Sequence, residues 1–215
     1  MILRFLNDGI LNIYKLILTI HYKNAKSAED LFWYIGDELP DMLVEAVEKR
    51  TVAGKALDLG CGTGENAIYL AKNGYEVTAI DFVDEALDIA KKNAEDAGVK
   101  IEFIKGDVLK WESDKKYDFI LDGGCLHGIS PKYLRNIYRE RIPKFLAENG
   151  ELVIMHFGKK HKFDYSPVGP RRVSHEKINQ FFKPFLYELS YSTREIKVGF
   201  PIGTIIAGSY WFRKK

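Results

Sequence analysis

The stretch LDLGCGTGENAIYL, Leu57–Leu70, places three glycines between an apolar run and a helical pattern. The glycines are Gly60, Gly62 and Gly64, and Asp58 precedes them. Glycine adopts positive φ values readily and lets a ligand approach the backbone closely. The spacing differs from the G-x-G-x-x-G of dinucleotide loops, and no G-K-[ST] ending of a phosphate loop follows. The pattern predicts a loop whose backbone contacts a ligand.

Strand and helix patterns alternate outward from this loop. Apolar runs typical of buried strands cover 55–60, 75–80, 99–107, 116–124 and 151–157, and helical patterns cover 64–74, 84–98 and 130–150. Pro143, inside the last helical pattern, predicts a kink or a break. A helix at 174–185 and strands at 187–198 and 204–214 follow. This alternation indicates βαβ units around a mostly parallel sheet.

Acidic residues mark the ends of the predicted strands. Asp58 lies near the end of the first strand, and Asp81, Asp107 and Asp122 lie at the ends of three others. The carboxyl ends of parallel strands share one edge of a sheet, where ligands bind in open α/β folds. A single aspartate there is often a solvated turn residue. Four aspartates at the ends of predicted strands, together with a glycine loop, predict one binding site.

The charge and cysteine content exclude several classes of protein. Lys and Arg number 32 against 30 Asp and Glu, so the net charge of +2 gives no long-range attraction to nucleic acid or membranes. The two cysteines, Cys61 and Cys125, are too few for a disulfide scaffold and suit a reducing compartment. We expect packing roles for both, with a redox pair as the alternative. A cytoplasmic location is expected.

The first fifty residues form a separate pattern. Arg4, Asp8 and Lys15 interrupt its apolar run, so no span approaches the roughly 20 apolar residues of a membrane helix. No small-residue cleavage site follows, so no signal peptide is expected. Apolar residues recur at steps of three and four, as on one face of an amphipathic helix: Ile2, Leu6, Ile10, Ile13, Ile17 and Ile20.

This helix is expected to pack on the body of the protein or over the site. A membrane-surface helix and a partner-docking face are the alternatives. We therefore divide the chain into an N-terminal helical extension or lid, residues 1–50, and a core, residues 51–215, within one domain overall.

LDLGCGTG closely resembles the first motif of class I S-adenosylmethionine-dependent methyltransferases, and the resemblance covers about residues 30–160. It implies a Rossmann-like α/β fold, in which a mostly parallel seven-stranded sheet has helices on both faces. It also implies S-adenosylmethionine (SAM) as cofactor and S-adenosylhomocysteine (SAH) as product. The cofactor carries an ammonium, a sulfonium and a vicinal diol but no phosphate, which suits acidic neighbours and a loop without lysine.

The resemblance also assigns the methionine end of the cofactor. The glycine loop from Gly60 to Gly64, together with Asp58 and Cys61, would face the methionine part. Asp122 and Gly123, at the end of the fourth strand, would border the methyl group.

The adenosine end is assigned to the next two strand ends. Asp81 would hold the ribose hydroxyls, and Phe82 would cover the adenine. Asp107 would accept a hydrogen bond from the adenine amino group, and Val108 would offer its backbone.

Two flanking segments resemble a narrower group, the thiopurine methyltransferase family, which includes thiol and halide methyltransferases. LFWYIGDELPDML, residues 31–43, is similar to its W-x-I-G-x-x-x-P segment, in which Trp33 would help enclose the cofactor. GPRRVSHEKINQFF, residues 169–182, is similar to its G-P-P-aromatic-x-V segment, but Arg171 and Arg172 replace the second proline and the aromatic residue. Phe32 and Tyr34 also depart from the usual Pro and Asp. The group implies a thiol or another soft nucleophile as methyl acceptor.

Methyl transfer from a sulfonium needs mainly proximity and alignment, because the leaving group becomes a neutral thioether. His127, after the fourth strand, is the candidate catalytic base or substrate contact, and its alternative role is to line the cofactor pocket. Arg171 and Arg172 are candidates for binding an anionic small-molecule substrate, or belong to a solvated flap.

Other partners fit the sequence less well. His156, His161 and Asp164 lack the spacing of a zinc site, so no metal is expected. Asp122-Gly123-Gly124-Cys125 differs from the Asp/Asn-Pro-Pro-aromatic stretch of nucleic-acid amino methyltransferases, so nucleic acid is an unlikely partner. The alternatives kept open are a SAM-binding sensor or partner subunit without transfer activity, and an RNA or protein methyltransferase. The oligomeric state stays open.

Overall fold

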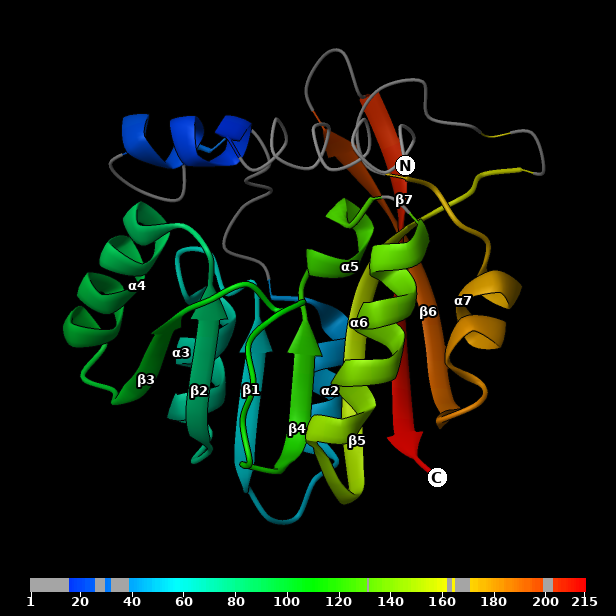
Figure 1. Ribbon diagram of the computed structural model, residues 1–215, viewed down its shortest axis with the longest axis horizontal. Helices are drawn as coiled ribbons and strands as arrows, with labels where there is room; N and C mark the ends of the chain where they lie inside the picture. Colours follow the sequence, from blue (N-terminus) through cyan, green and yellow to red (C-terminus); the bar gives the residue numbers. More distant parts are fainter. Residues whose placement is uncertain are drawn as a thin grey trace.

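The computed structural model describes residues 16–25, 30–31, 39–130, 132–161, 164, 171–198 and 203–215. Trp33, Gly169, Pro170 and the apolar positions before residue 16 lie outside the described residues. The helical pattern of the N-terminal extension is described over residues 16–24. In Figure 1 this helix, drawn in blue, lies above strand β2 (Glu76–Asp81) and helix α4 (Asp84–Asp96).

A seven-stranded sheet with the order β3-β2-β1-β4-β5-β7-β6 forms the centre of the fold (Figure 1). Its strands are β1 Lys55–Leu59, β2 Glu76–Asp81, β3 Ile101–Lys105, β4 Tyr117–Asp122, β5 Leu146–Gly158, β6 Leu186–Val198 and β7 Gly203–Lys214. The first five strands are parallel to one another, whereas β7 runs antiparallel to both β5 and β6. The predicted mostly parallel α/β fold is confirmed.

Helices cover both faces of the sheet. They are α2 Asp41–Glu48, α3 Glu65–Lys72, α4 Asp84–Asp96, α5 Cys125–Gly128, α6 Lys132–Phe145 and α7 His175–Phe182. On one face, side chains of α2, α3 and α4 pack with alternate strand residues such as Phe119 and Val153. On the other face, α6 and α7 pack with Ile120 and Ile154, the next residues along the same strands. The central strands are therefore buried on both sides, as parallel strands in α/β folds are.

The helix predicted over 130–150 is shorter than expected. α6 ends at Phe145, two residues after Pro143, and β5 begins at Leu146. Asn149 and Gly150, the last residues of the predicted helical pattern, lie inside β5, where the pairing with β4 shifts register between Tyr117 and Phe119. Asn149 has a φ of 59°, a conformation that asparagine tolerates better than most residues. The pair therefore accommodates an irregular strand rather than ending a helix.

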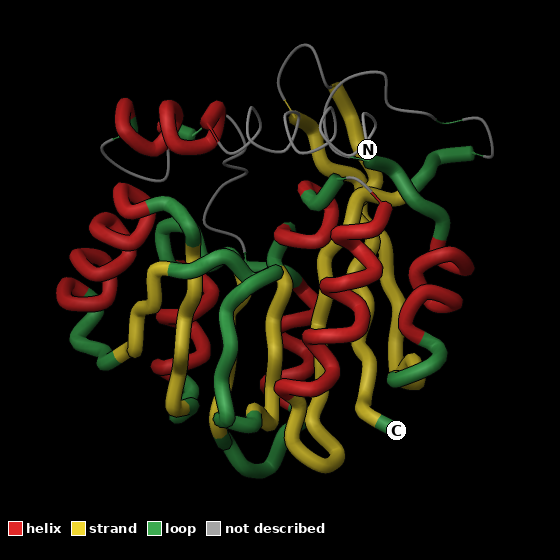
Figure 2. The backbone as a smooth tube through the Cα atoms, viewed as in Figure 1, coloured by secondary structure: helices red, strands yellow, loops and turns green. Residues whose placement is uncertain are grey.

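The strand order reverses between β1 and β4, which are direct neighbours. The chain moves from β1 to β2 and β3 on one side, and to β4 and β5 on the other. The loops that follow β1 and β4 consequently emerge at the same end of the sheet (Figure 2). Such a reversal is where open α/β sheets bind their ligands.

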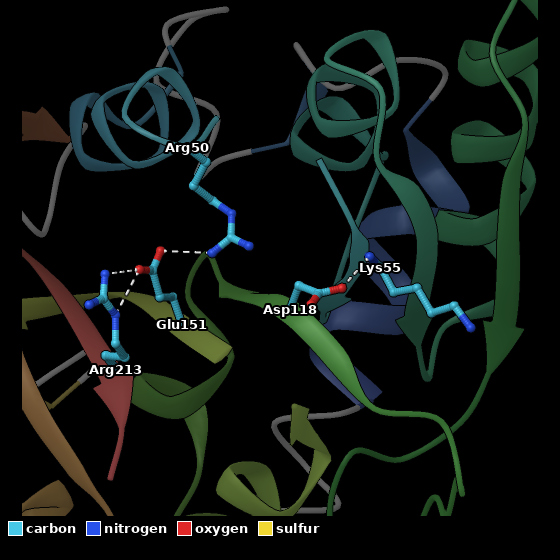
Figure 3. A network of polar contacts seen from close by, with 5 residues as sticks. All are labelled: Arg50, Lys55, Asp118, Glu151 and Arg213. Carbon is cyan, nitrogen blue, oxygen red and sulfur yellow. Dashed lines mark hydrogen bonds and ion pairs between the residues drawn. The ribbon is translucent and has the colours of Figure 1, made fainter. Parts of the chain in front are cut away.

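A buried carboxylate joins distant segments at the opposite end of the sheet. Glu151 at the start of the parallel part of β5 is 3% exposed. It accepts hydrogen bonds from Arg50, just after α2, at 3.1 Å and from Arg213 of β7 at 2.6 Å (Figure 3). In the same view, the backbone amide of Lys55 donates to the Asp118 carboxylate at 2.8 Å. These contacts anchor β1, β5 and β7 away from the ligand-binding edge.

We expect Glu151→Ala to lower the free energy of unfolding by about 2 kcal/mol, because it leaves two arginines without their shared acceptor. Urea unfolding followed by circular dichroism measures this change. Glu148→Ala, at an exposed position of the same strand, is the matched control and should change stability by less than about 0.5 kcal/mol. Equal stabilities of the two variants would contradict the structural role of Glu151.

Candidate functional site

The glycine loop follows β1 and turns sharply back toward β2. Gly60, Gly62 and Gly64 have φ values of 68°, 55° and 90°. The backbone amides of Gly60 and Cys61 both donate to the carbonyl of Ile80, at 2.8 and 3.0 Å. Positive φ values strain residues with a Cβ, so the glycines are required by the path of the chain itself. The loop thereby presents backbone rather than side chains at the edge of the sheet.

Neighbouring residues approach the loop closely enough to exclude larger side chains. A Cβ on Gly60 would lie 3.3 Å from the Cβ of Cys125, and one on Gly64 would lie 3.0 Å from the Cβ of Ala90. A Cβ on Gly62 would meet the hydroxyl of Tyr22 at 2.9 Å. Tyr22 belongs to the helical residues 16–24, so this part of the N-terminal extension lies directly against the glycine loop.

Asp81 connects the loop to the start of α4. Its carboxylate accepts hydrogen bonds from the amide of Gly62 at 3.0 Å and from the amide of Val83 at 2.9 Å. The residue is 6% exposed, and burial raises the pKa of its carboxyl above the ordinary value. These bonds hold the carboxylate in a fixed orientation at the end of β2, beside the loop.

Asp58 is the carboxylate with an unsatisfied atom. It is 1% exposed, and its Oδ2 atom has no hydrogen-bond partner. Burial, and then the nearby charges of Asp122, Asp81 and Glu65, raise its pKa from 3.8 to about 8. A buried carboxylate oxygen without a donor is expensive, so it marks a position that a cationic ligand group would stabilise.

The residues assigned to the adenosine end lie at the carboxyl ends of β2 and β3. Phe82, next to Asp81, is partly buried and packs against Tyr22, Leu31 and other members of a small apolar cluster. Asp107 forms a turn, in which its carboxylate accepts a hydrogen bond from the amide of Leu109 at 2.9 Å.

Val108, inside this turn, is buried and belongs to the apolar cluster that also contains Leu57 and Ile80.

Asp122 has a structural task that the sequence did not reveal. Its carboxylate accepts hydrogen bonds from the amides of Gly124, Cys125 and Leu126, which begin the short helix α5. The hydroxyl of Tyr138 donates to the same carboxylate at 2.5 Å. Burial raises the pKa of Asp122, whereas these donors lower it. The carboxylate is thus occupied within the protein.

Gly123 is more open to a ligand than Asp122. A Cβ on this glycine would lie 3.1 Å from the side-chain nitrogen of Asn66, in the first turn of α3, and 3.7 Å from the Cε of Met155. Asn66 and Met155 therefore border the end of β4. Sequence reasoning selected neither residue, because nothing in their local patterns distinguishes them from ordinary helix and strand residues.

His127 lies in α5. Its ring, together with the rings of His156 and Phe157, forms a surface that we call the aromatic wall. Its ring stacks on Phe157 with centroids 4.4 Å apart and meets the ring of His156 edge-on at 6.1 Å. Its Nδ1 atom is buried without a partner. Burial, followed by the neighbouring His156, lowers the pKa of His127 to about 3.

His156 is 2% exposed, and burial together with Arg171 and Arg135 lowers its pKa to about 4. Both imidazoles are neutral near physiological pH.

The two arginines selected from the sequence have different environments. Arg172 pairs with the buried Asp164 at 2.5 Å. The second oxygen of Asp164 accepts a hydrogen bond from the amide of Lys160 at 2.9 Å. Arg171 is exposed and has no carboxylate partner among the described residues. Arg172 therefore stabilises its own loop, and Arg171 is the one available to a ligand.

Other groups in the described part of the chain do not suggest a metal or a membrane anchor. Across its described ranges, the structure brings together no three His, Cys, Asp or Glu side chains in a metal-binding arrangement. None of the helices described has the length and apolarity needed to cross a bilayer. Cys61 and Cys125 are both free thiols.

Comparison with known proteins agrees with this geometry. Residues 56–150 match a family described as "Methyltransferase domain". The match covers the glycine loop, Asp81, Asp107 and α5, but it ends before Arg171.

Two curated relatives are methyltransferases. A 2-heptyl-1-hydroxyquinolin-4(1H)-one methyltransferase of Mycobacteroides abscessus is 28% identical over 155 residues, which are 71% of this chain and 67% of that protein. A ubiquinone biosynthesis O-methyltransferase of Rickettsia conorii is 32% identical over 153 residues, which are 66% of this chain and 51% of that protein. The chain thus spans between about half and two thirds of the length of these relatives.

A solved structure shows the same fold. The N-methyltransferase NodS from Bradyrhizobium japonicum, in complex with S-adenosyl-l-homocysteine, has a TM-score of 0.65 and 16% sequence identity. The comparison covers 80% of this chain and 84% of that chain.

The buried Asp58 predicts an unusual dependence of stability on pH. Because its pKa is raised in the folded state, the folded protein binds more protons than the unfolded chain between about pH 4 and 8. The free energy of unfolding should therefore fall as the pH rises through this window. We expect Asp58→Asn to unfold with a free energy roughly 1 to 3 kcal/mol higher near neutral pH, measured by urea titration.

Asp114→Asn, at an exposed position after β3, is the control and should leave the pH dependence unchanged. An Asp58→Asn variant that is no more stable than the wild type at any pH would refute this account of the buried carboxylate.

Proposed function

We propose that the chain is a class I S-adenosylmethionine-dependent methyltransferase and that it transfers the methyl group of this cofactor to a small-molecule acceptor. The two relatives named above carry names that describe small acceptors, which supports a similar substrate class here. The finer proposal is that the acceptor atom is a thiol sulfur or another soft nucleophile. The observation that carries the proposal is a glycine loop without a phosphate-binding lysine, next to a buried carboxylate, Asp58, that has one oxygen without a hydrogen-bond partner.

The residues at the site fit SAM. Its ammonium group suits the unpartnered oxygen of Asp58, and its diol suits the fixed carboxylate of Asp81. Gly60 to Gly64 leave room for the methionine part, and Phe82 with the turn at Asp107 and Val108 suits the adenine. We propose backbone contacts, rather than the occupied carboxylate, for Asp122 and Gly123. Cys61, which is buried behind the loop, would contribute packing.

The cofactor supplies an electrophilic methyl group on a positively charged sulfur. In the proposed reaction, a thiol acceptor loses its proton, its sulfur forms a bond to the methyl carbon, and the bond from that carbon to the sulfonium breaks. The products are a methyl thioether, SAH and one proton. The protein's main contribution is alignment, which is worth roughly 7 to 11 kcal/mol in well-oriented reactions.

His127 is a weak base in this environment. A pKa of about 3 means that its neutral ring has little tendency to take a proton from the acceptor. We therefore propose that His127 contacts and positions the acceptor, and that the acceptor is a group that ionises readily by itself. Thiols meet this requirement better than amines or aliphatic hydroxyls.

The N-terminal extension, residues 1–50, would close the site, with residues 51–215 as the catalytic core. Tyr22 against Gly62 supports a lid position for residues 16–24. Trp33, which lies outside the described residues, is proposed to enclose the cofactor from the same segment. The two free thiols suit a cytoplasmic enzyme.

The test of the proposal is release of SAH from SAM across a panel of small thiols, phenols, amines and carboxylates, with bulk tRNA included. We expect turnover with thiols, and a rate that rises with pH along the ionisation of each thiol. No separate inflection from His127 should appear above about pH 5, because its ring is already neutral. Turnover with amines or tRNA alone would contradict the soft-acceptor proposal.

Asp81→Asn should weaken SAH binding by about 10-fold to 100-fold, because it removes charge-assisted hydrogen bonds to the diol. Isothermal titration calorimetry measures the affinity. Asp84→Asn is the matched control, since Asp84 lies three residues further on and pairs with Lys105 at the surface. If both variants bind SAH as tightly as the wild type, Asp81 does not hold the ribose.

A further inference from the structure

An arginine that sequence reasoning missed lies beside the aromatic wall. Arg135 is in the first turn of α6, and its guanidinium donates a hydrogen bond to the carbonyl of Ile129 at 3.0 Å. Ile129 follows α5 directly, so this bond places the charge at the junction of α5 and α6. That junction is on the same side of the sheet edge as His127. Arg135 is half-buried.

Arg171 reaches the same region from another part of the chain. The amide of Val173 donates to the carbonyl of Phe157 at 2.9 Å, which fixes residues 171–173 against the end of β5. The pair between Arg172 and Asp164 fixes this segment from its other side. Burial, followed by the nearby charge of Arg171, lowers the pKa of Arg135, and burial followed by Arg171 lowers the pKa of His156. The contacts at Ile129 and Phe157 bring both arginines to the vicinity of the stacked rings of His127 and Phe157.

Arg135 and Arg171 differ from most other described arginines because they have no carboxylate partner among the described residues. Five arginines in the described ranges each pair with a carboxylate: Arg50, Arg139, Arg141, Arg172 and Arg213. Among the same residues, no carboxylate pairs with Arg135 or Arg171. Two neighbouring cations, one of them half-buried, repel each other unless an anion lies between them. The missing counter-ion therefore points to a ligand.

We infer that the methyl acceptor carries an anionic oxygen group, and that Arg135 and Arg171 together bind it. This inference rests on the proposed function and narrows it to anionic acceptors. Guanidinium groups match the geometry of carboxylates and phosphates, so the site selects for such a group rather than for charge alone. The acceptor would lie along His127, His156 and Phe157, with its anionic end at the arginines and its nucleophile toward the glycine loop.

The arrangement has a second effect on the reaction. The rings of His127 and His156 are neutral and the ring of Phe157 is apolar, so this wall does not screen the two arginine charges. Positive charges close to a thiol favour its ionised form. The arginines would thus orient the acceptor by binding its anionic group, and they would favour ionisation of its thiol.

The experiment compares matched acceptors that differ only in the anionic group, para-mercaptobenzoate and para-thiocresol, in the full-length protein. We expect Arg135→Gln and Arg171→Gln each to lower kcat/KM for the carboxylate by about 10-fold or more, chiefly through KM. The loss of kcat/KM for the neutral acceptor should be clearly smaller, because this acceptor loses only the effect of the arginine charge on the ionisation of its thiol. Lysine at either position should restore part of the loss.

Arg139→Gln is the matched control, because Arg139 is one turn further along α6 and lies over the ring of Phe181. It should affect both acceptors equally or not at all. Equal losses for the carboxylate and the neutral acceptor in Arg135→Gln and Arg171→Gln would overturn the inference.

A binding measurement separates this inference from the proposed reaction. Benzoate, which has no nucleophilic thiol, is titrated into the SAH-loaded protein and into the Arg135→Gln/Arg171→Gln variant. Binding to the wild type that is lost in the variant supports the anion site even if no acceptor turns over. Absence of binding to the wild type, or equal binding to both proteins, would overturn the inference while leaving methyl transfer to neutral acceptors intact.

Discussion

The parallel pairing of β1 with both β2 and β4 is the constraint on which the site depends. It buries β1 at the centre of the sheet and sends the chain outward on either side of it. Two loops must then leave the same end of the sheet from adjacent strands, with no strand between them to fill the space. The first loop bends back to the carbonyl of Ile80, and this bend requires positive φ at three glycines. The ligand-binding surface follows from sheet topology and from backbone geometry together.

Three buried aspartates at this edge differ in how far hydrogen-bond donors of the protein satisfy their carboxylates. Asp122 is satisfied by the helix that it begins, and Asp81 by the loop that it holds. Asp58 has an oxygen that nothing in the described chain satisfies. Donors offset part of the cost of burying the first two carboxylates, whose pKa values burial still raises. The third destabilises the empty protein, and a cation in the site would reverse that penalty.

The sequence predicted the fold, and the placement of the glycine loop and the strand-end acids at one edge of the sheet, because these depend on local patterns. Glycine spacing, apolar runs and strand-end acids are each visible within a dozen residues, and the order of the elements then determines the topology. Asn149 was misread because the same Asn-Gly signal ends a helix and accommodates an irregular strand. The choice between them depends on Tyr117 across the sheet. Arg135 was missed for a similar reason, since only the fold brings this half-buried arginine and the segment of Arg171 to the same region.

The network around Glu151 has a consequence for how the chain is made. Arg50 and Glu151 are 101 residues apart, and Glu151 and Arg213 are a further 62 residues apart. Trp211 of β7 also belongs to the apolar cluster in which Met42 of α2 is buried. During synthesis, α2 therefore leaves the ribosome long before the strand that covers it exists. The cofactor half of the sheet can assemble early, whereas the part of the apolar face of α2 that β7 covers stays exposed until the last strand is made.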